Sequence, residues 1–154
     1  LLAVFVNHGD NTHNQQRILC PEEDPRCPRP ILYVTDLGGT FGGKGYFTSL
    51  RNWTKKARIW KDPSACVADF EGMSPGYRDP HISEAGRAFL AGLLGRLSEG
   101  QVRDLFTGAR FDVLNGIELP LPGKDGKTRK ATIEDWVRVF MDKRRQILKA
   151  KCLP

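Results

Sequence analysis

The sequence of 154 residues lacks any apolar run long enough to cross a membrane. Its first segment, Leu1–Val6, is apolar but far shorter than the roughly 20 residues that a membrane-spanning helix needs. The segment also lacks the basic region and the cleavage site of a signal peptide. Because the chain begins with leucine rather than methionine, we expect a fragment or a processed product, and a signal could lie upstream. We expect no membrane span within these residues.

Cysteine is scarce, and no two cysteines have the C-x-x-C spacing that is typical of a structural zinc site. The four cysteines are Cys20, Cys27, Cys66 and Cys152. Cys20 and Cys27 flank most of a proline-rich insert, so a disulfide between them would close a long connection. Cys66 would then pair with Cys152. Two such bridges favour an exported or periplasmic protein, and four reduced cysteines in a cytoplasmic protein are the alternative that the sequence leaves open.

Acidic residues are outnumbered, since 24 Lys and Arg face 18 Asp and Glu and give a net charge of +6. The excess gathers at 55–61, 124–130 and 143–151. We interpret these clusters first as solvated helix faces and loops, with attraction to anions such as nucleotide phosphates as the functional alternative. Nucleic acid is not an expected partner, because the chain has no recognition motif and few aromatic residues within its basic runs.

The pattern of apolar residues predicts an α+β fold that is mainly helical, with a small β-hairpin followed by a helical bundle. The hairpin strands are expected at 16–20 and 31–36. We interpret the whole chain, 1–154, as a single domain. Its successive parts would be a hairpin region (1–46), an irregular region (47–82) and a helical region (83–154).

Three helices are predicted in the last part of the chain from the residues that begin them. Ser83 is a good N-cap for the first helix. Ser98 and Gln101 have the spacing of a capping box for the second. Thr132 and Asp135 have the same spacing at the start of the third. The apolar residues expected on the buried faces are Leu90, Leu93, Leu94, Leu97, Val102, Leu105, Phe106, Ala109, Trp136, Val137, Phe140, Ile147 and Leu148.

Two stretches show no clear periodicity. The region 47–82 holds Trp53, Trp60 and Phe70, which we interpret as aromatic anchors of an irregular segment. The stretch 112–131 is expected to be a loop, because its tip is rich in turn-forming residues.

Two aspartates flank the predicted hairpin. Asp10 lies in the polar loop before the first strand, and Asp36 ends the second strand, directly before Leu37 and Gly38. Either aspartate alone is explained by a loop cap or a turn. A hairpin can bring such ends together, however, and divalent cations prefer carboxylate oxygens while phosphate esters bind the cation. The pair therefore indicates a site for a cation and a phosphate ester.

The order of these elements resembles the catalytic and metal-binding loops of the protein-kinase superfamily, which carry H-R-D-x-x-x-x-N, a short hairpin and D-F-G. The matching residues are His8-Gly9-Asp10, Gln15 and Asp36-Leu37-Gly38. The match covers about the first quarter of the chain. With the helices that follow, it implies the C-terminal lobe of an atypical member, such as the bacterial, phosphoinositide or secretory-pathway kinases. Gly9 replaces the arginine of the family motif, and residues 1–154 do not include the Gly-rich loop and strand lysine of an N-terminal lobe.

The resemblance implies an ATP-dependent phosphotransferase. Asp10 would orient or deprotonate the acceptor hydroxyl, and Asp36 would hold Mg²⁺, or Mn²⁺, on the nucleotide phosphates. Gln15, which stands where the family has Asn, would reach a second cation. The residues implied to contact the nucleotide are Asn11, Asn14, Gln15 and Gly38. The missing lobe would lie on another chain or upstream, and the phosphate acceptor is left open.

Two other functions fit the same residues. A non-catalytic binding or scaffold module of the same fold is favoured by the missing lobe and by Gln15. A metal-dependent phosphoesterase would need more ligands than the chain offers, because no H-x-H or H-E-x-x-H spacing is present. Its candidate ligands are His8, Asp10, His13 and Asp36.

The glycine-rich segment 38–45 satisfies the first part of a phosphate-binding loop motif, G-x-x-x-x-G-K. Gly45, however, stands where Ser or Thr should hold magnesium, and no helix pattern follows. We therefore predict a flexible loop after Asp36 rather than a P-loop.

Overall fold

The computed structural model describes residues 1–9, 13–20, 26–43, 48–56, 58–70, 78–113, 121–122 and 128–153. Helices hold 44% of this part of the chain and strands 14%, so the predicted α+β, mainly helical class is confirmed. The helices are α1 (Leu2–Val6), α2 (Leu50–Lys55), α3 (Glu84–Gly95), α4 (Glu99–Gly108) and α5 (Ile133–Lys149), with a 3₁₀ turn η1 (His13–Gln15). The strands form antiparallel pairs, namely β1 (Gln16–Leu19) with β2 (Ile31–Val34), β3 (Trp60–Asp62) with β4 (Val67–Ala68), and β5 (Leu121–Pro122) with β6 (Thr128–Arg129).

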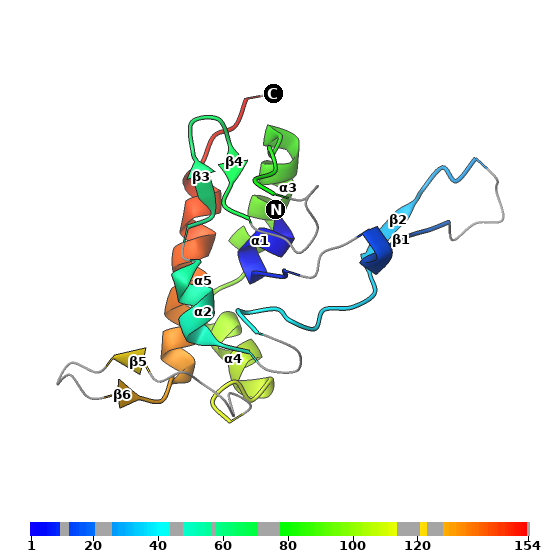
Figure 1. Ribbon diagram of the computed structural model, residues 1–154. Coiled ribbons are helices and arrows are strands. Elements are labelled where there is room, and N and C mark those ends of the chain that lie inside the picture. Colours follow the sequence, from blue (N-terminus) through cyan, green and yellow to red (C-terminus); the bar gives the residue numbers. More distant parts are fainter. Residues whose placement is uncertain are drawn as a thin grey trace.

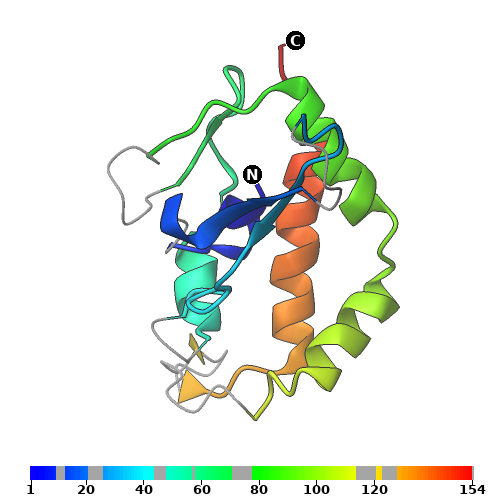
Figure 2. The same cartoon turned by 90° about the vertical axis from the view of Figure 1, so that its right-hand side faces the viewer.

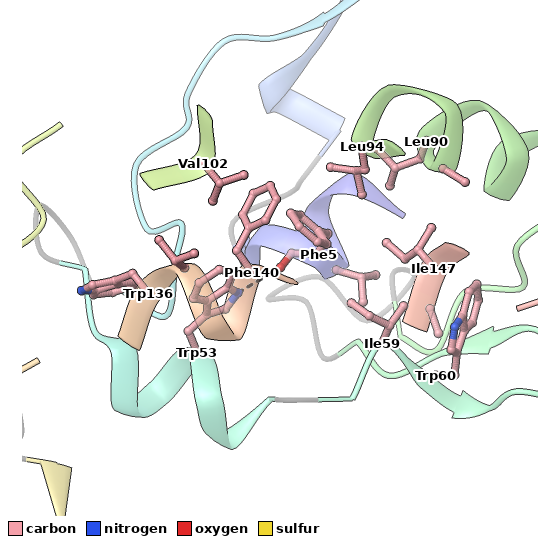
Figure 3. Packing of buried hydrophobic residues seen from close by; sticks show 14 of the residues in the cluster. Phe5, Trp53, Ile59, Trp60, Leu90, Leu94, Val102, Trp136, Phe140 and Ile147 are labelled. Carbon is pink, nitrogen blue, oxygen red and sulfur yellow. Dashed lines mark hydrogen bonds between the residues drawn. The ribbon is translucent and has the colours of Figure 1, made fainter. Parts of the chain in front are cut away.

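Helix α5 lies at the centre of the helices, and α2, α3 and α4 pack against it (Figure 1, Figure 2). Its side chains Trp136, Phe140 and Ile147 are buried. Trp53 of α2 and Phe106 of α4 lie against Trp136, with ring centroids 5.8 and 5.9 Å away. Figure 3 shows Trp53, Trp136 and Phe140 meeting between the helices. Because aromatic side chains bury large apolar areas, this cluster forms the main core of the described residues.

The predicted capping residues begin the three later helices. Ser83 accepts a hydrogen bond from a backbone amide in the first turn of α3, over 3.2 Å. Ser98 and Gln101 form a capping box at the start of α4. Thr132 and Asp135 form another at the start of α5. The three helix predictions are confirmed because short-range hydrogen bonds fix these starts.

The buried faces of the helices are narrower than predicted. Leu93 is 47% exposed, Leu105 is 59% exposed and Leu148 is 40% exposed, and Ala109 is exposed as well. The prediction was wrong for Leu93 and Leu105 because α3 and α4 each pack against α5, which covers one side of each helix. It was also wrong for Leu148, in the last turn of α5, and for Ala109, which directly follows α4. None of the helices in the described ranges has both the length and the apolar character that crossing a membrane requires.

The region 47–82 is more regular than predicted, because it contains α2, β3 and β4. These elements have two to six residues, which is too few for apolar periodicity to show in the sequence. The interpretation of its aromatic residues is confirmed, since Trp53, Trp60 and Phe70 are all buried. The Trp53 indole donates to the Phe5 carbonyl over 2.9 Å (Figure 3), which ties α2 to α1.

The stretch 112–131, predicted to be a loop, contains the short pair β5–β6. Each strand has two residues, so the correction is small. The predicted tip was 122–127; Pro122 instead ends β5, and 123–127 lie outside the described residues.

Both predicted disulfides are present. Cys20–Cys27 closes the connection between β1 and β2. Cys66–Cys152 joins the segment after α5 to the turn between β3 and β4, across 86 residues of sequence. The Cys152 amide also donates to the Glu84 carboxylate over 2.8 Å. The last residues of the chain are thereby held against α3 and the β3–β4 pair.

The β1–β2 pair projects from the rest of the molecule (Figure 1, Figure 2). We call residues 13–20 and 26–35 the hairpin arm, and the helices α1 to α5 with β3 and β4 the helical body. The strands of the arm were predicted correctly to within two residues. Their apolar side chains are nevertheless turned to solvent, with Ile18 70% exposed and Leu32 64% exposed. The arm therefore contributes little to the apolar core.

Candidate functional site

Two backbone hydrogen bonds bring together the segment before the arm and the segment after it. The Thr35 amide donates to the Gln15 carbonyl over 2.8 Å, at the base of the arm. The Phe41 amide donates to the Val6 carbonyl over 2.6 Å, at the end of α1. The chain between these two bonds forms a closed ring. The candidate catalytic loop belongs to one side of the ring, and the segment after β2 belongs to the other.

Asp36, the predicted metal ligand, lies one residue beyond the hydrogen bond at the base of the arm and is exposed. Its Oδ1 accepts a hydrogen bond from the Gly38 amide over 2.7 Å, which is an Asx-type turn. A Cβ atom at position 38 would lie 2.9 Å from that oxygen, so the turn favours glycine. The other carboxylate oxygen, Oδ2, has no hydrogen-bond partner within the described part of the chain. Asp36 can therefore keep its turn and still offer one oxygen to a cation.

Gln15, the other predicted metal ligand, is held at the same end of the arm. The Thr35 hydroxyl lies 3.0 Å from the side-chain oxygen of Gln15 and 3.2 Å from its main-chain oxygen. Because Thr35 directly precedes Asp36, the two predicted ligands stand at adjoining ends of paired strands. The amide oxygen has two lone pairs and keeps one for another partner.

The other predicted site residues are Asp10, Asn11, Asn14 and Gly38. The two that the structure describes, Asn14 and Gly38, do not contact Asp36 or Gln15 in a way that would build a phosphate site. Asp10 and Asn11 lie outside the described residues, so their predicted roles stay predictions. Asn14 is exposed in η1. The amide of Gly38 is bonded to Asp36, so in this structure it is not open to a phosphate group.

His8 is buried at the beginning of the ring, with 2% of its surface exposed. Its backbone amide donates to the Ala3 carbonyl over 2.8 Å. Neither ring nitrogen has a hydrogen-bond partner among the residues that the structure describes. The backbone of His8 thus braces the end of α1, while its imidazole is left unpaired, which costs free energy in a buried position.

The segment 38–43 is anchored to the helical body, which corrects the prediction of a flexible loop there. The Phe41 ring packs against Trp53 and Phe106, with centroids 5.0 and 5.8 Å apart. At Gly42, φ is +73°, and a Cβ atom would lie 2.4 Å from the backbone nitrogen of Trp53. Only glycine fits such a close approach. The signal available in the sequence was a single phenylalanine between pairs of glycines.

The described residues of the site suit a cation that brings its own ligands. They contain no group of three or more His, Cys, Asp or Glu that could hold a metal ion. One carboxylate oxygen and one amide oxygen do suit Mg²⁺, which keeps several water or phosphate ligands and binds proteins through one or two carboxylates. The chemistry therefore fits a nucleotide-bound cation better than a structural metal.

No family model, no curated protein and no solved structure matches this chain. The kinase-like interpretation accordingly rests on the motifs of the sequence.

Proposed function

We propose that the protein is an ATP-dependent phosphotransferase built on a kinase-like C-terminal lobe. Asp36 binds Mg²⁺ or Mn²⁺ on the nucleotide phosphates, and Gln15 reaches the second cation. Asp10 orients or deprotonates the acceptor hydroxyl. The residues proposed to contact the nucleotide are Asn11, Asn14 and Gln15, without Gly38, because the amide of Gly38 is bonded to Asp36.

The observation that carries the proposal is the ring of chain that is closed on one side by Phe41 and on the other by Thr35. It supports a shared site, because the two bonds hold the described residues on both sides of the predicted catalytic loop, Val6 and Gln15, against the segment that contains Asp36. An ordinary turn aspartate needs no such ring. Asp62 accepts a hydrogen bond from the Ser64 amide over 2.9 Å in a similar turn at the end of β3.

The proposed chemistry requires further groups around the nucleotide. Phosphoryl transfer depends on positioning and on cations that neutralise the developing charge, with little covalent chemistry for the protein to do. We propose that an N-terminal lobe, upstream or on another chain, supplies the remaining phosphate contacts. The two disulfides support a location outside the reducing cytoplasm, in an exported protein.

The binding step is tested by titrating the full-length polypeptide with ATP in the presence of Mg²⁺ or Mn²⁺, by calorimetry. Asp36→Asn keeps an oxygen for the Gly38 amide but removes the charge, and should weaken binding at least about tenfold. Asp62→Asn changes the same kind of exposed turn on the helical body and should leave binding unchanged. No binding by the full-length protein with either cation, or equal binding by both variants, would contradict the proposal.

The catalytic step is tested with Asp10→Asn in an assay of phosphate transfer or ATP turnover. A residue that acts on the acceptor hydroxyl should lower kcat by about a hundredfold or more and leave ATP binding intact. A loss of binding equal to that of Asp36→Asn would show that Asp10 acts elsewhere.

A second candidate function is a non-catalytic binding module of the same fold. The exposure of Ile18 and Leu32 on the arm favours it, because exposed apolar patches mark interaction surfaces. A double variant distinguishes the two functions. A binding module would tolerate Asp10→Asn and Asp36→Asn together, whereas the phosphotransferase would lose all turnover.

A further inference from the structure

A cavity of about 510 Å³ lies between α2 and the C-terminal half of α5, on the helical body. Thr54 of α2 lines one side. The charged side chains in its lining all come from α5, namely Asp142, Lys143, Arg145 and Lys149. The volume falls within the range of small-molecule sites. No residue of the candidate phosphotransfer site takes part in the lining.

Lys143 is the unusual member of this lining, because only 1% of its surface is exposed. Its ammonium donates a hydrogen bond to the Lys56 carbonyl and lies 5.7 Å from the centre of the Trp53 ring. Among the described residues it makes no ion pair. Desolvation by burial lowers the pKa of Lys143 to about 8, against a weaker opposing effect of Asp69. The interpretation of 143–151 as a solvated basic face is therefore wrong for Lys143.

The charges in the lining do not balance. Arg145 and Asp142 form an ion pair over 2.9 Å and neutralise each other. Lys149 is exposed and makes no ion pair within the described ranges. Lys143 and Lys149 thus leave the cavity with two positive charges in excess. Burial of the Lys143 ammonium, which Asp69 offsets only weakly, costs free energy that a nearby bound anion would partly recover.

We propose that this cavity binds a multiply charged oxyanion of the phosphate class, contacted by the exposed Lys149 ammonium and attracted by the charge of the buried Lys143 ammonium. The Lys149 ammonium has three N–H donors and, within the described ranges, forms no ion pair. Charge-assisted hydrogen bonds from ammonium to phosphate oxygens are about twice as strong as neutral ones. Two cations favour an anion with more than one negative charge over a simple carboxylate. Binding requires neither a divalent cation nor a nucleotide base.

The test is a calorimetric titration of the full chain with inorganic pyrophosphate, near neutral pH and in the presence of a metal chelator. Lys143→Met keeps the length of the buried side chain and should weaken binding at least about tenfold. Lys149→Gln changes an exposed residue at the end of α5 and should weaken binding several-fold. Lys130→Gln removes the same charge at the opposite end of α5 and should change binding less than twofold.

A second measurement ties the anion to the buried ammonium. The pKa of Lys143, followed by NMR of its side chain, should rise when pyrophosphate is added, because an anion favours the charged form. Asp36→Asn should bind pyrophosphate as the unchanged protein does. The proposal is overturned by an absence of binding, by equal binding in Lys149→Gln and Lys130→Gln, or by loss of binding in Asp36→Asn.

Discussion

The helical body and the hairpin arm are built in opposite ways. In the body, large side chains such as Trp136 and Ile147 are fully buried. In the arm, residues of the same kind are exposed, as with Ile18 at 70% and Leu32 at 64%. The body is held by an apolar core, whereas the arm is held by strand hydrogen bonds and by Cys20–Cys27.

This contrast indicates that different regions govern the stability of the fold and the proposed chemistry. An isolated two-stranded hairpin is at best marginally stable in water. Gln15 and Asp36 nevertheless lie close together, because the Thr35 amide closes the base of the arm on the Gln15 carbonyl. The Phe41 amide, which donates to Val6 of α1, ties the segment after the arm to the body. The core should therefore govern folding, and the base of the arm should govern nucleotide binding.

The largest expected difference in stability between the helical body and the arm comes from their two disulfides. Replacing Cys66 and Cys152 by Ser removes a closure of 86 residues, and should lower the free energy of unfolding by about 4–5 kcal/mol. Replacing Cys20 and Cys27 removes a closure of 7 residues within the arm, and should cost at most about 2.5 kcal/mol. Urea unfolding followed by tryptophan fluorescence measures the free energy of unfolding of both double variants. Equal losses of this free energy would contradict the distinction between body and arm.

Truncation of matched isoleucines is the next test. Ile147→Ala, at a fully buried position, should cost about 2–5 kcal/mol because it opens a cavity in the core. Ile18→Ala, at a position that is 70% exposed, should change the stability by less than about 0.5 kcal/mol. Both are read from the midpoint of urea unfolding. A cost at Ile18 close to that at Ile147 would show that the arm belongs to the core.

The smallest effect concerns the pH dependence of the body. The Glu84 carboxylate accepts hydrogen bonds from the Arg87 side chain and the Cys152 amide, and these lower its pKa to about 2. Since folding depresses this pKa, the stabilisation is present above about pH 4.5 and is lost as the pH falls toward about 2. The difference in unfolding free energy between the unchanged protein and Glu84→Gln should therefore shrink on acidification. A difference that stays constant with pH would rule out this linkage.

Local hydrogen bonding made part of the fold predictable from the sequence. The pairs Ser98–Gln101 and Thr132–Asp135 begin helices wherever they precede an apolar pattern. The two disulfides followed from spacing and elimination. In contrast, α2, β3 and β4 are too short to show a period, and the exposure of Leu93 depends on which side of α3 meets α5.

The sequence is enough to propose the candidate site but not the contacts that support it. Asp10 and Asp36 stand out because they flank the predicted hairpin, and Gln15 because of the resemblance to the kinase motif. The anchoring of Phe41 depends on Trp53 and Phe106, which lie far away in the sequence. The burial of Lys143 could not be predicted for the same reason. A lysine within a basic run is expected to be solvated, and its burial depends on α2, which is distant in the sequence.

Hydrogen–deuterium exchange of the full-length polypeptide, with and without ATP and Mg²⁺, tests the central claim most directly. If nucleotide binds at the base of the arm, the amides of 13–20 and 31–41 should exchange more slowly in its presence. The amides of α3 should not change. Unchanged exchange in 13–20 and 31–41, or protection confined to the helical body, would contradict the account.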